Sequence, residues 1–381
     1  MMVAQIRSSL GFGARLALGA VLLWFATLGA PAHAASDLAK ECTASLEQTR
    51  LWIRATDPQA PEDEKATVRA AVKKTNEICT AAREASPKDG KVLVDAAYAL
   101  FAMGDTPAGV KLIEKAAEAG HPPAMVMTAR YMGVGDHLEK DSEGAWMMLI
   151  QTLKSDHPSS RIQAALEFLP GGVGPESPKR TRKVLKEMID AGNGEAMVTY
   201  AMKVLGLQKA EAGSDEAKEG IALLERAATE AKDGTALIYL SLLHNQGTMV
   251  ERSEAKAKEY AQAAIDVGIN RAYATMGQIH QNQGDYEAAF KWFKQGAEAG
   301  DGFSQAMLGF LYSGGFGVDE DLDKAVEWWT KGRWNGDRLA ASYLQVHREG
   351  QQAKAEWEKK HAEDAKAKAD KAAEEKAKKS E

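Results

Sequence analysis

The sequence predicts an all-α protein: a right-handed superhelical solenoid of about eight helix-turn-helix repeats, preceded by a helical hairpin and followed by a charged helix or tail. Three observations support this fold class. The composition is rich in Ala, Leu, Glu and Lys, with only 11 prolines and 7% aromatic residues, which favours helices over strands. Small residues recur at nearly constant spacing through most of the chain. Glycines stand at a fixed distance before most of them.

Residues 1–34 have the features of a secretory signal peptide. Two arginines provide a basic start, and an apolar run follows at residues 16–30. Pro31 then leads into Ala32-His33-Ala34, the small-x-small pattern that signal peptidase recognises. We therefore expect cleavage after Ala34, export to the periplasm of a Gram-negative bacterium and no membrane insertion of the mature chain. An uncleaved signal anchor is the alternative.

A helical hairpin is predicted for residues 35–91. Helices at residues 37–56 and 62–85 flank a turn that contains two prolines. The two cysteines of the chain, Cys42 and Cys79, fall on these helices at nearly the same level, about 21 to 26 Å from the turn. A disulfide between them is therefore expected in an oxidising compartment, and two buried thiols are the alternative.

A repeat is predicted for residues 92–350. Small residues separated by 36, 36, 40, 36, 32 and 36 positions mark it, at Ala124, Ser160, Ala196, Ala236, Ala272, Ser304 and Ala340, and Val92 extends the series backward by 32. Four residues before them stand Gly120, Gly192, Gly268, Gly300 and Gly336, with Asp156 and Lys232 as exceptions. We expect each glycine to end a helix in the left-handed conformation, and each small residue to let two helix axes approach closely.

The second helix of each repeat carries an apolar pair about 8 residues before the end of the unit. Trp292-Phe293 and Trp328-Trp329 show this pair best, each three and four residues after an alanine. The spacing predicts one buried face, so we assign Trp328 and Trp329 to the core and Trp334 to the surface. Helix N-caps are predicted at Thr106, Ser177, Ser253 and Asp323.

These patterns resemble a known repeat family. Residues 307–329, with Leu308-Gly309, Gly314-Gly315, Gly317-Val318, Ala325 and Trp328-Trp329, are similar to the Sel-one-like repeat, a relative of the tetratricopeptide repeat. Residues 272–300, joined by Gly284-Asp285-Tyr286, resemble the tetratricopeptide version more. The resemblance covers residues 92–350 and is weak in the units at Ser160 and Ala196. Members of the family act as adaptors and assembly platforms, and several exported bacterial members regulate envelope signalling or secretion.

The resemblance implies a concave surface, lined by the first helix of every repeat, that suits an extended peptide or another protein. The family's pattern places eight residues of this sequence there: Arg130, Leu242, Asn245, Arg271, Gln278, Gln281, Phe310 and Ser313. A solvated helix face without a ligand is the alternative. The expected partner is a protein, such as a membrane sensor or an envelope assembly factor.

The candidate catalytic and metal-binding residues of the sequence have structural explanations. The chain contains no G-x-S-x-G, H-E-x-x-H or G-x-x-x-x-G-K motif. Ser253 and Lys256 match the S-x-x-K spacing of serine acyl-transferring enzymes, but Ser253 fits a helix cap better. His244 and His280 occupy a repeat position where the family has a packing aromatic, so no metal or other cofactor is predicted. We therefore predict a noncatalytic scaffold; a cell-wall-directed hydrolase or a β-lactam-binding enzyme is the alternative.

The charge distribution limits the class of partner. The formal net charge is −6, and near −8 without the presequence, which argues against binding to nucleic acid or anionic lipid. Residues 351–381 contain nine lysines and eight acidic residues, with almost nothing apolar after Trp357. We expect this segment to be a frayed helix or a disordered tail, and a spacer toward a partner is the further possibility.

Overall fold

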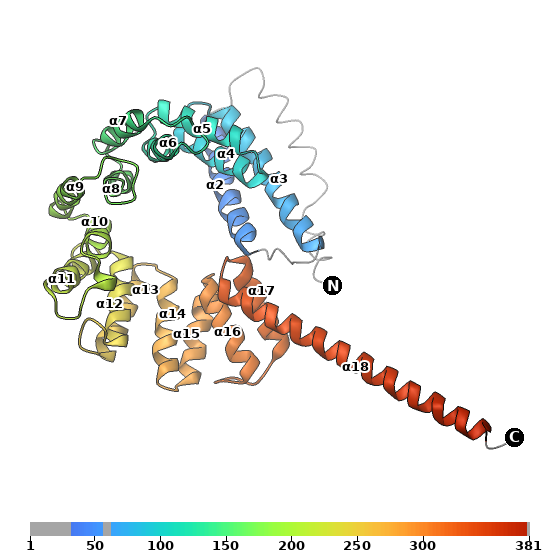
Figure 1. Cartoon of the computed structure of the whole chain (residues 1–381). Helices are drawn as coiled ribbons and strands as arrows, with labels where there is room; N and C mark the ends of the chain where they lie inside the picture. Colours follow the sequence, from blue (N-terminus) through green and yellow to red (C-terminus); the bar gives the residue numbers. More distant parts are fainter. Residues whose placement is uncertain (1–31, 56–61, 379–381) are drawn as a thin grey trace. The chain divides into compact units, whose positions relative to one another are not determined.

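The computed structural model describes residues 32–55 and 62–378. In these residues every regular element is helical, and no strand is present (Figure 1). The all-helical class predicted from the sequence is therefore confirmed. The signal-peptide prediction rests on residues 1–34, of which 1–31 lie outside the described residues, so cleavage after Ala34 stays a prediction.

Contacts divide the chain into two compact units, with the junction between Leu185 and Lys186, inside α9 (Pro178–Asp190). Before α9, the first unit contains α2 (Ala32–Ala55), α3 (Glu62–Ala85), α4 (Gly90–Met103), α5 (Thr106–Glu118), α6 (Pro122–Val134), α7 (Ser142–Thr152) and α8 (Pro158–Leu166). After α9, the second contains α10 (Gly194–Thr199), the π-helix η2 (Tyr200–Val204), the 3-10 helix η3 (Leu207–Lys209), α11 (Asp215–Thr229), α12 (Gly234–Gln246), α13 (Glu254–Asp266), α14 (Arg271–Asn282), α15 (Tyr286–Glu298), α16 (Gly302–Gly314), α17 (Leu322–Trp334) and α18 (Arg338–Lys378).

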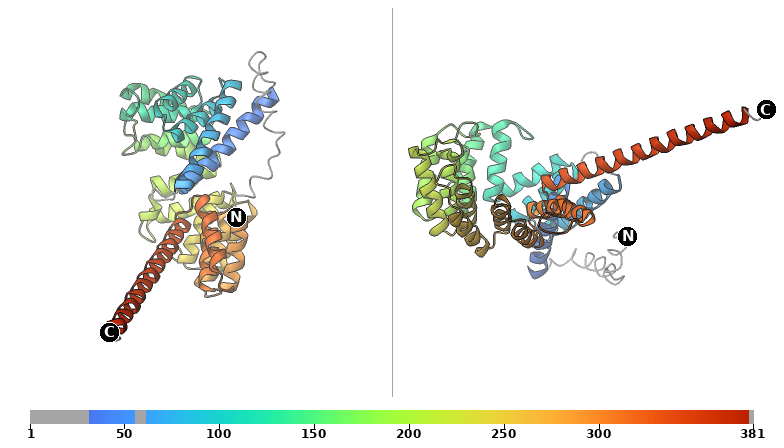
Figure 2. Two further views of the ribbon diagram at one scale, coloured as in Figure 1. Left: turned by 90° about the vertical axis from the view of Figure 1, so that its right-hand side faces the viewer. Right: turned by 90° about the horizontal axis from the view of Figure 1, so that it is seen from below.

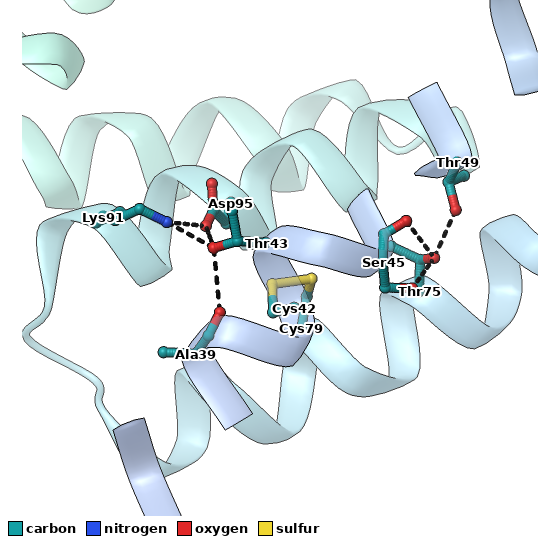
Figure 3. The surroundings of a disulfide bond; sticks show 9 residues. All are labelled: Ala39, Cys42, Thr43, Ser45, Thr49, Thr75, Cys79, Lys91 and Asp95. Atoms are coloured by element: carbon teal, nitrogen blue, oxygen red, sulfur yellow. Dashed lines mark hydrogen bonds and ion pairs between the residues drawn. A yellow bond between two sulfur atoms is a disulfide. The ribbon is translucent and has the colours of Figure 1, made fainter. Parts of the chain in front are cut away.

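The predicted N-terminal hairpin and its disulfide are both present. Helices α2 and α3 are both formed, and Cys42 on α2 is bonded to Cys79 on α3, with their Cα atoms 4.8 Å apart (Figure 3). The turn predicted between them lies outside the described residues. Both cysteines are fully buried and pack against Val92 and Ala96 of α4. The disulfide therefore lies inside the core that joins the hairpin to the first repeat.

Hydroxyl groups satisfy one another on either side of the disulfide. Thr75 lies 2.7 Å from the hydroxyls of both Ser45 and Thr49, and both threonines are buried. On the other side, Thr43 donates to Asp95 Oδ2 at 2.6 Å, which ties α2 to α4 (Figure 3). These bonds satisfy polar groups that would otherwise cost free energy when buried.

The residues that mark the repeat behave as the pattern predicts. All eight are buried: Val92, Ala124, Ser160, Ala196, Ala236, Ala272, Ser304 and Ala340. The five predicted glycines all have a left-handed backbone, at Gly120 (φ 80°), Gly192 (82°), Gly268 (86°), Gly300 (87°) and Gly336 (80°). Of the two exceptions, Lys232 adopts the same conformation with φ 51°, although it carries a side chain.

Three units share one long turn between their helices. In each, a left-handed glycine ends the first helix, and the backbone N–H of the next N-cap residue donates to a carbonyl near the end of that helix. These pairs are Asp141 to Met132 (3.0 Å), Ser253 to His244 (2.9 Å) and Asp321 to Tyr312 (2.9 Å). The two shorter units turn directly at Gly104 and Gly284. The difference in unit length therefore lies in this turn.

Two of the four predicted N-caps are displaced. Ser253 caps α13, where its Oγ accepts from Lys256 N at 3.4 Å, and Ser177 directly precedes α9. Thr106 was expected to cap α5, but Asp105 does so by accepting from Ala108 N at 3.2 Å. Asp321, rather than Asp323, caps α17 by accepting from Lys324 N at 2.9 Å. In both cases an aspartate that precedes the first helical residue supplies the carboxylate that accepts from a free N–H group.

The units at Ser160 and Ala196 are irregular. Helix α8 ends at Leu166, after nine residues. Helix α10 has six residues and continues as the π-helix η2, followed by Gly206 with φ 66° and the short η3. These two units are also the ones where the sequence resemblance is weakest.

The second helices bury the predicted apolar pairs. Phe293 is fully buried and Trp329 is 5% exposed, while Trp328 is half-buried against the same cluster. Trp334 was expected to be exposed, but it is half-buried, and the Arg333 guanidinium lies 4.8 Å from its ring centre. The aliphatic and planar parts of the arginine thus cover the indole.

Helix α18 begins within the last repeat and continues through the charged tail. Ala340 and Leu344 are buried against the preceding unit, whereas the side chains after Arg348 are exposed wherever they are described. The helix extends past the repeats as a single rod (Figure 2). Of the helices described in residues 32–55 and 62–378, none has the length and apolar character needed to span a bilayer.

Candidate functional site

The first helices of the second unit form a continuous layer. Helices α10, α12, α14 and α16 each contact the next first helix along the stack, which for α16 is α18, as well as the second helix of their own unit (Figure 1). Six of the eight predicted surface residues occupy equivalent places on three of these helices: Leu242 and Asn245 on α12, Gln278 and Gln281 on α14, and Phe310 and Ser313 on α16. We call these six residues the first-helix face. All of them are half-buried, so each keeps part of its side chain open to solvent.

The three amides of this face are available for a ligand. The side-chain amides of Asn245, Gln278 and Gln281 make no hydrogen bond to any other described residue. A primary amide offers two N–H donors and one carbonyl acceptor, the groups that match a peptide backbone. The face therefore presents donors and acceptors in a row along consecutive helices.

At the α16 end the face becomes aromatic. Phe310 stacks on Phe316 at 5.5 Å and on Tyr343 at 6.0 Å, between ring centres. Ser313 donates to the carbonyl oxygen of Phe310 at 2.9 Å, so its hydroxyl serves its own helix. This end offers an apolar surface to a partner rather than polar groups.

The structure gives both predicted arginines partners within the chain. Arg271 Nη1 lies 3.7 Å from Asp301 Oδ1, and its guanidinium covers the ring of Phe303 at 4.4 Å. Arg130, in the first unit, pairs through Nε with Glu167 at 2.6 Å. The Glu167 side chain is 10% exposed and also accepts from Val173 N at 3.1 Å. Arg130 therefore stabilises the fold by neutralising a nearly buried carboxylate. Its role in binding a partner stays a prediction.

The equivalent residues His244, His280 and Tyr312 act as packing groups. His244 is 5% exposed and stacks on Tyr260 at 5.7 Å. His280 Nδ1 lies 3.3 Å from Asp285 Oδ2, and Tyr312 packs against Phe290 at 5.4 Å. In the described part of the chain, no group of three or more His, Cys, Asp or Glu is arranged to hold a metal ion.

Two pKa shifts near these residues follow from local structure. The Ala288 backbone N–H, which Asp285 caps, lowers the pKa of that carboxyl, and the hydrogen bond with His280 adds to the effect. Burial raises the pKa of the Tyr260 hydroxyl, and the nearby Glu225 and Glu259 raise it further. Both groups therefore keep one charge state at neutral pH.

An apolar cavity of about 300 Å³ adjoins the first-helix face. Its floor is formed by buried Leu207 and Leu224, and its walls by Met202, Leu243 and Met249. Tyr239, Gln208, Gln246 and Thr248 complete the lining. We call this cavity the η2–α12 pocket, because residues of η2 and α12 line it.

Sequence reasoning missed this pocket. Its signal was present in the unit that deviates from the others, with 40 residues instead of 36. Predicting a cavity from this pattern would have required knowing that the helix loosens into a π-turn at Tyr200.

The Sel1 repeat family model matches four segments of the chain: residues 96–121, 234–268, 275–301 and 302–332. The last three correspond to the units at Ala236, Ala272 and Ser304. No matched segment lies between residues 122 and 233, where the two irregular units are found.

Among curated proteins, the chitin synthase regulator SKT5 of Saccharomyces cerevisiae is 23% identical over 247 residues. The match covers 61% of this chain, which spans only 35% of the length of that relative.

Three solved structures are also similar. The protective antigen c5321 of uropathogenic Escherichia coli, described as displaying an SLR fold, has 18% identity and a TM-score of 0.41, over 71% of this chain and 60% of that one. A Sel1 repeat protein from Oxalobacter formigenes has 20% identity and a TM-score of 0.43, over 63% and 98%. Yeast Tom70 has 13% identity and a TM-score of 0.48, over 84% and 65%. With four matched segments on a helical repeat whose marker residues are buried as expected, the chain contains Sel1 repeats.

Proposed function

We propose that this chain is a noncatalytic scaffold that binds an extended segment of another protein along the first-helix face. One observation carries the proposal. Equivalent residues on α12, α14 and α16 form a row, and the side-chain amides in this row make no hydrogen bond within the described chain. An extended peptide has regularly spaced N–H and C=O groups that such a row can satisfy. The buried repeat core supplies the rigid support that such a surface needs.

The proposal includes the cellular location of the protein. Residues 1–34 have the pattern of a signal peptide, and the disulfide between Cys42 and Cys79 suits an oxidising compartment. We therefore propose export to the periplasm and a role in envelope signalling or assembly. Expression with the native N-terminus tests this, because the mature chain from a periplasmic fraction is expected to begin at Ala35. A mature protein that retains Met1 in the cytoplasm would contradict it.

Site-specific photocrosslinking tests the scaffold. A photoreactive residue replaces Gln278 on the face, and the matched control replaces exposed Lys291 on α15, the second helix of the same unit. In intact cells we expect one discrete protein adduct from position 278 and none from position 291. Equal adducts at both positions, or none at either, would overturn the proposal. Turnover of peptidoglycan or a β-lactam by the pure protein, abolished by one substitution, would establish an enzyme instead.

A further inference from the structure

Comparison with the equivalent residues of a later repeat shows that the η2–α12 pocket lacks an aromatic ring. Tyr239 and Leu243 of α12 stand at the positions that Met307 and Leu311 occupy in α16. In the later unit, Met307 and Leu311 form a closed cluster with Phe293 of the preceding second helix. In the corresponding helix α11, the place of Phe293 is taken by the fully buried Leu224, which has no ring.

The missing ring leaves the neighbouring residue of α12 less buried than its equivalent in α16. Leu311 is fully buried beneath its neighbours, whereas Leu243, at the same repeat position, stays half-exposed. The first helix before α12 is the short α10 with its π-turn, while the first helix before α16 is the regular α14. A π-turn inside a helix frequently marks a functional site, because it displaces side chains from regular packing. Here it leaves about 300 Å³ open above Leu224.

The pocket and the first-helix face share neighbouring residues on α12. Tyr239, Leu242 and Gln246 follow one another on α12 at intervals of three and four residues, so they are neighbours on one side of the helix. Leu242 belongs to the first-helix face, and the other two line the pocket. A peptide on the face therefore passes the mouth of the pocket.

The rim of the η2–α12 pocket carries polar side chains that are available to a ligand. The side chains of Gln208, Gln246 and Thr248 make no hydrogen bond within the described residues. An apolar cavity of this volume with a few polar groups at its edge is the usual form of a site for a small group or side chain. The amides at the rim match the backbone on either side of an inserted side chain.

From these observations we infer that the η2–α12 pocket takes one aromatic side chain of the bound peptide, as Phe293 fills the equivalent place from within the chain. The inference rests on the proposed function and names the chemistry that anchors the partner. A buried ring contributes apolar burial at low entropic cost, which is why aromatic anchors often dominate peptide and protein interfaces.

Methyl NMR on the full chain tests the pocket without knowledge of the partner. The probe is N-acetyl-phenylalanine amide, and N-acetyl-alanine amide is the matched control compound. With ¹³C-methyl methionine, Met202 and Met249 report on the pocket, and Met147 on α7, which is 58% exposed, is the reference. We expect saturable shifts of the two pocket resonances with the phenylalanine probe alone. Shifts of Met147 to the same extent, or equal effects of both compounds, would overturn the inference, as would pocket resonances that never move.

Filling the pocket from inside gives a second test. Leu224→Phe restores the ring that α15 carries, and it is expected to weaken probe binding at least about tenfold. Because this change enlarges a buried side chain, Met202→Phe at the half-buried wall is measured as well, with Met249 as reporter. If both folded variants bind the probe like the unmodified chain, the pocket is not the site.

Crosslinking from Gln278 separates this inference from the proposed function. An adduct at position 278 without probe binding removes the anchor pocket and leaves the scaffold intact. Probe binding without any adduct supports an aromatic pocket and removes the scaffold proposal. An adduct that is lost in Leu224→Phe supports both.

Discussion

Gly309 lies directly against the indole of Trp329. A Cβ atom added to Gly309 would stand 2.5 Å from both Cδ1 and Nε1 of the indole, closer than any real contact. The indole Nε1 donates to the Ala306 carbonyl at 3.1 Å, which fixes the ring in this position. Gly277 has the same relationship with Phe293, where the added atom would be 2.7 Å from the ring. Glycine in the first helix thus lets the second helix of the unit approach closely.

We therefore expect Gly309→Ala to destabilise the second unit by about 1–3 kcal/mol, the usual effect of inserting a methyl group into a packed core. The measurement is the urea midpoint from circular dichroism at 222 nm. The matched control is Gly350→Ala in α18, where an added Cβ meets nothing within 4 Å. That control should raise stability by up to about 1 kcal/mol, because alanine is the better helix former. Equal effects of the two changes would show that the indole contact is unimportant.

Sequence periodicity was sufficient to predict the repeat, because backbone conformation and small-residue packing leave local marks. Gly300 and Ser304 can be recognised from their spacing alone, and the structure has them left-handed and buried, respectively. Cap selection was less certain because Asp321 and Asp323 are two residues apart and either can reach the free N–H groups. The pocket above Leu224 depends on how a helix relaxes around a missing ring, which is a tertiary effect that the unusual length of the unit does not specify.

Lys232 marks a place where the repeat departs from glycine without changing its backbone. Its φ of 51° is left-handed, a conformation that costs a residue with a side chain about 1–2 kcal/mol. We expect Lys232→Gly to stabilise the second unit by about 1 kcal/mol, in the same urea assay. Lys291→Gly, inside α15, is the control and should lower stability by about 1 kcal/mol. A loss of stability in Lys232→Gly would mean that the lysine makes compensating contacts.

Removing the disulfide should act on the first unit. A loop closed across 37 residues is worth about 3–4 kcal/mol in the chain-entropy model. The double variant Cys42→Ser and Cys79→Ser is therefore expected to lower the urea midpoint of that unit, and dithiothreitol should have the same effect on the unmodified chain. The variant itself is the control, since dithiothreitol should leave its midpoint unchanged. An unmodified chain that is insensitive to the reductant would contradict a structural role for the bridge.

His121 makes the stability of the first unit depend on pH. Burial lowers the pKa of His121 from its ordinary value of 6.5, and the nearby His157 lowers it further, against the opposing effects of Asp89 and Asp95. As the pH falls below 6.5, His121 becomes protonated in the unfolded chain while it is still neutral in the folded chain. The first unit should therefore lose stability on acidification, from 6.5 down to the lowered pKa of the folded state.

The variant His121→Asn separates this titration from the other groups of the chain. His121 occupies an N-cap position but makes no side-chain capping bond, whereas Asn193 at the equivalent position accepts from Ala196 N at 2.8 Å. We expect the variant to be more stable at every pH by about 1 kcal/mol, because the asparagine adds the missing cap. Its urea midpoint should also fall less steeply than that of the unmodified chain between pH 7.5 and about pH 5.5, where an ordinary histidine titrates. Parallel pH profiles would show that the histidine titrates alike in the folded and unfolded chains, and that the acid sensitivity of the unit has another source.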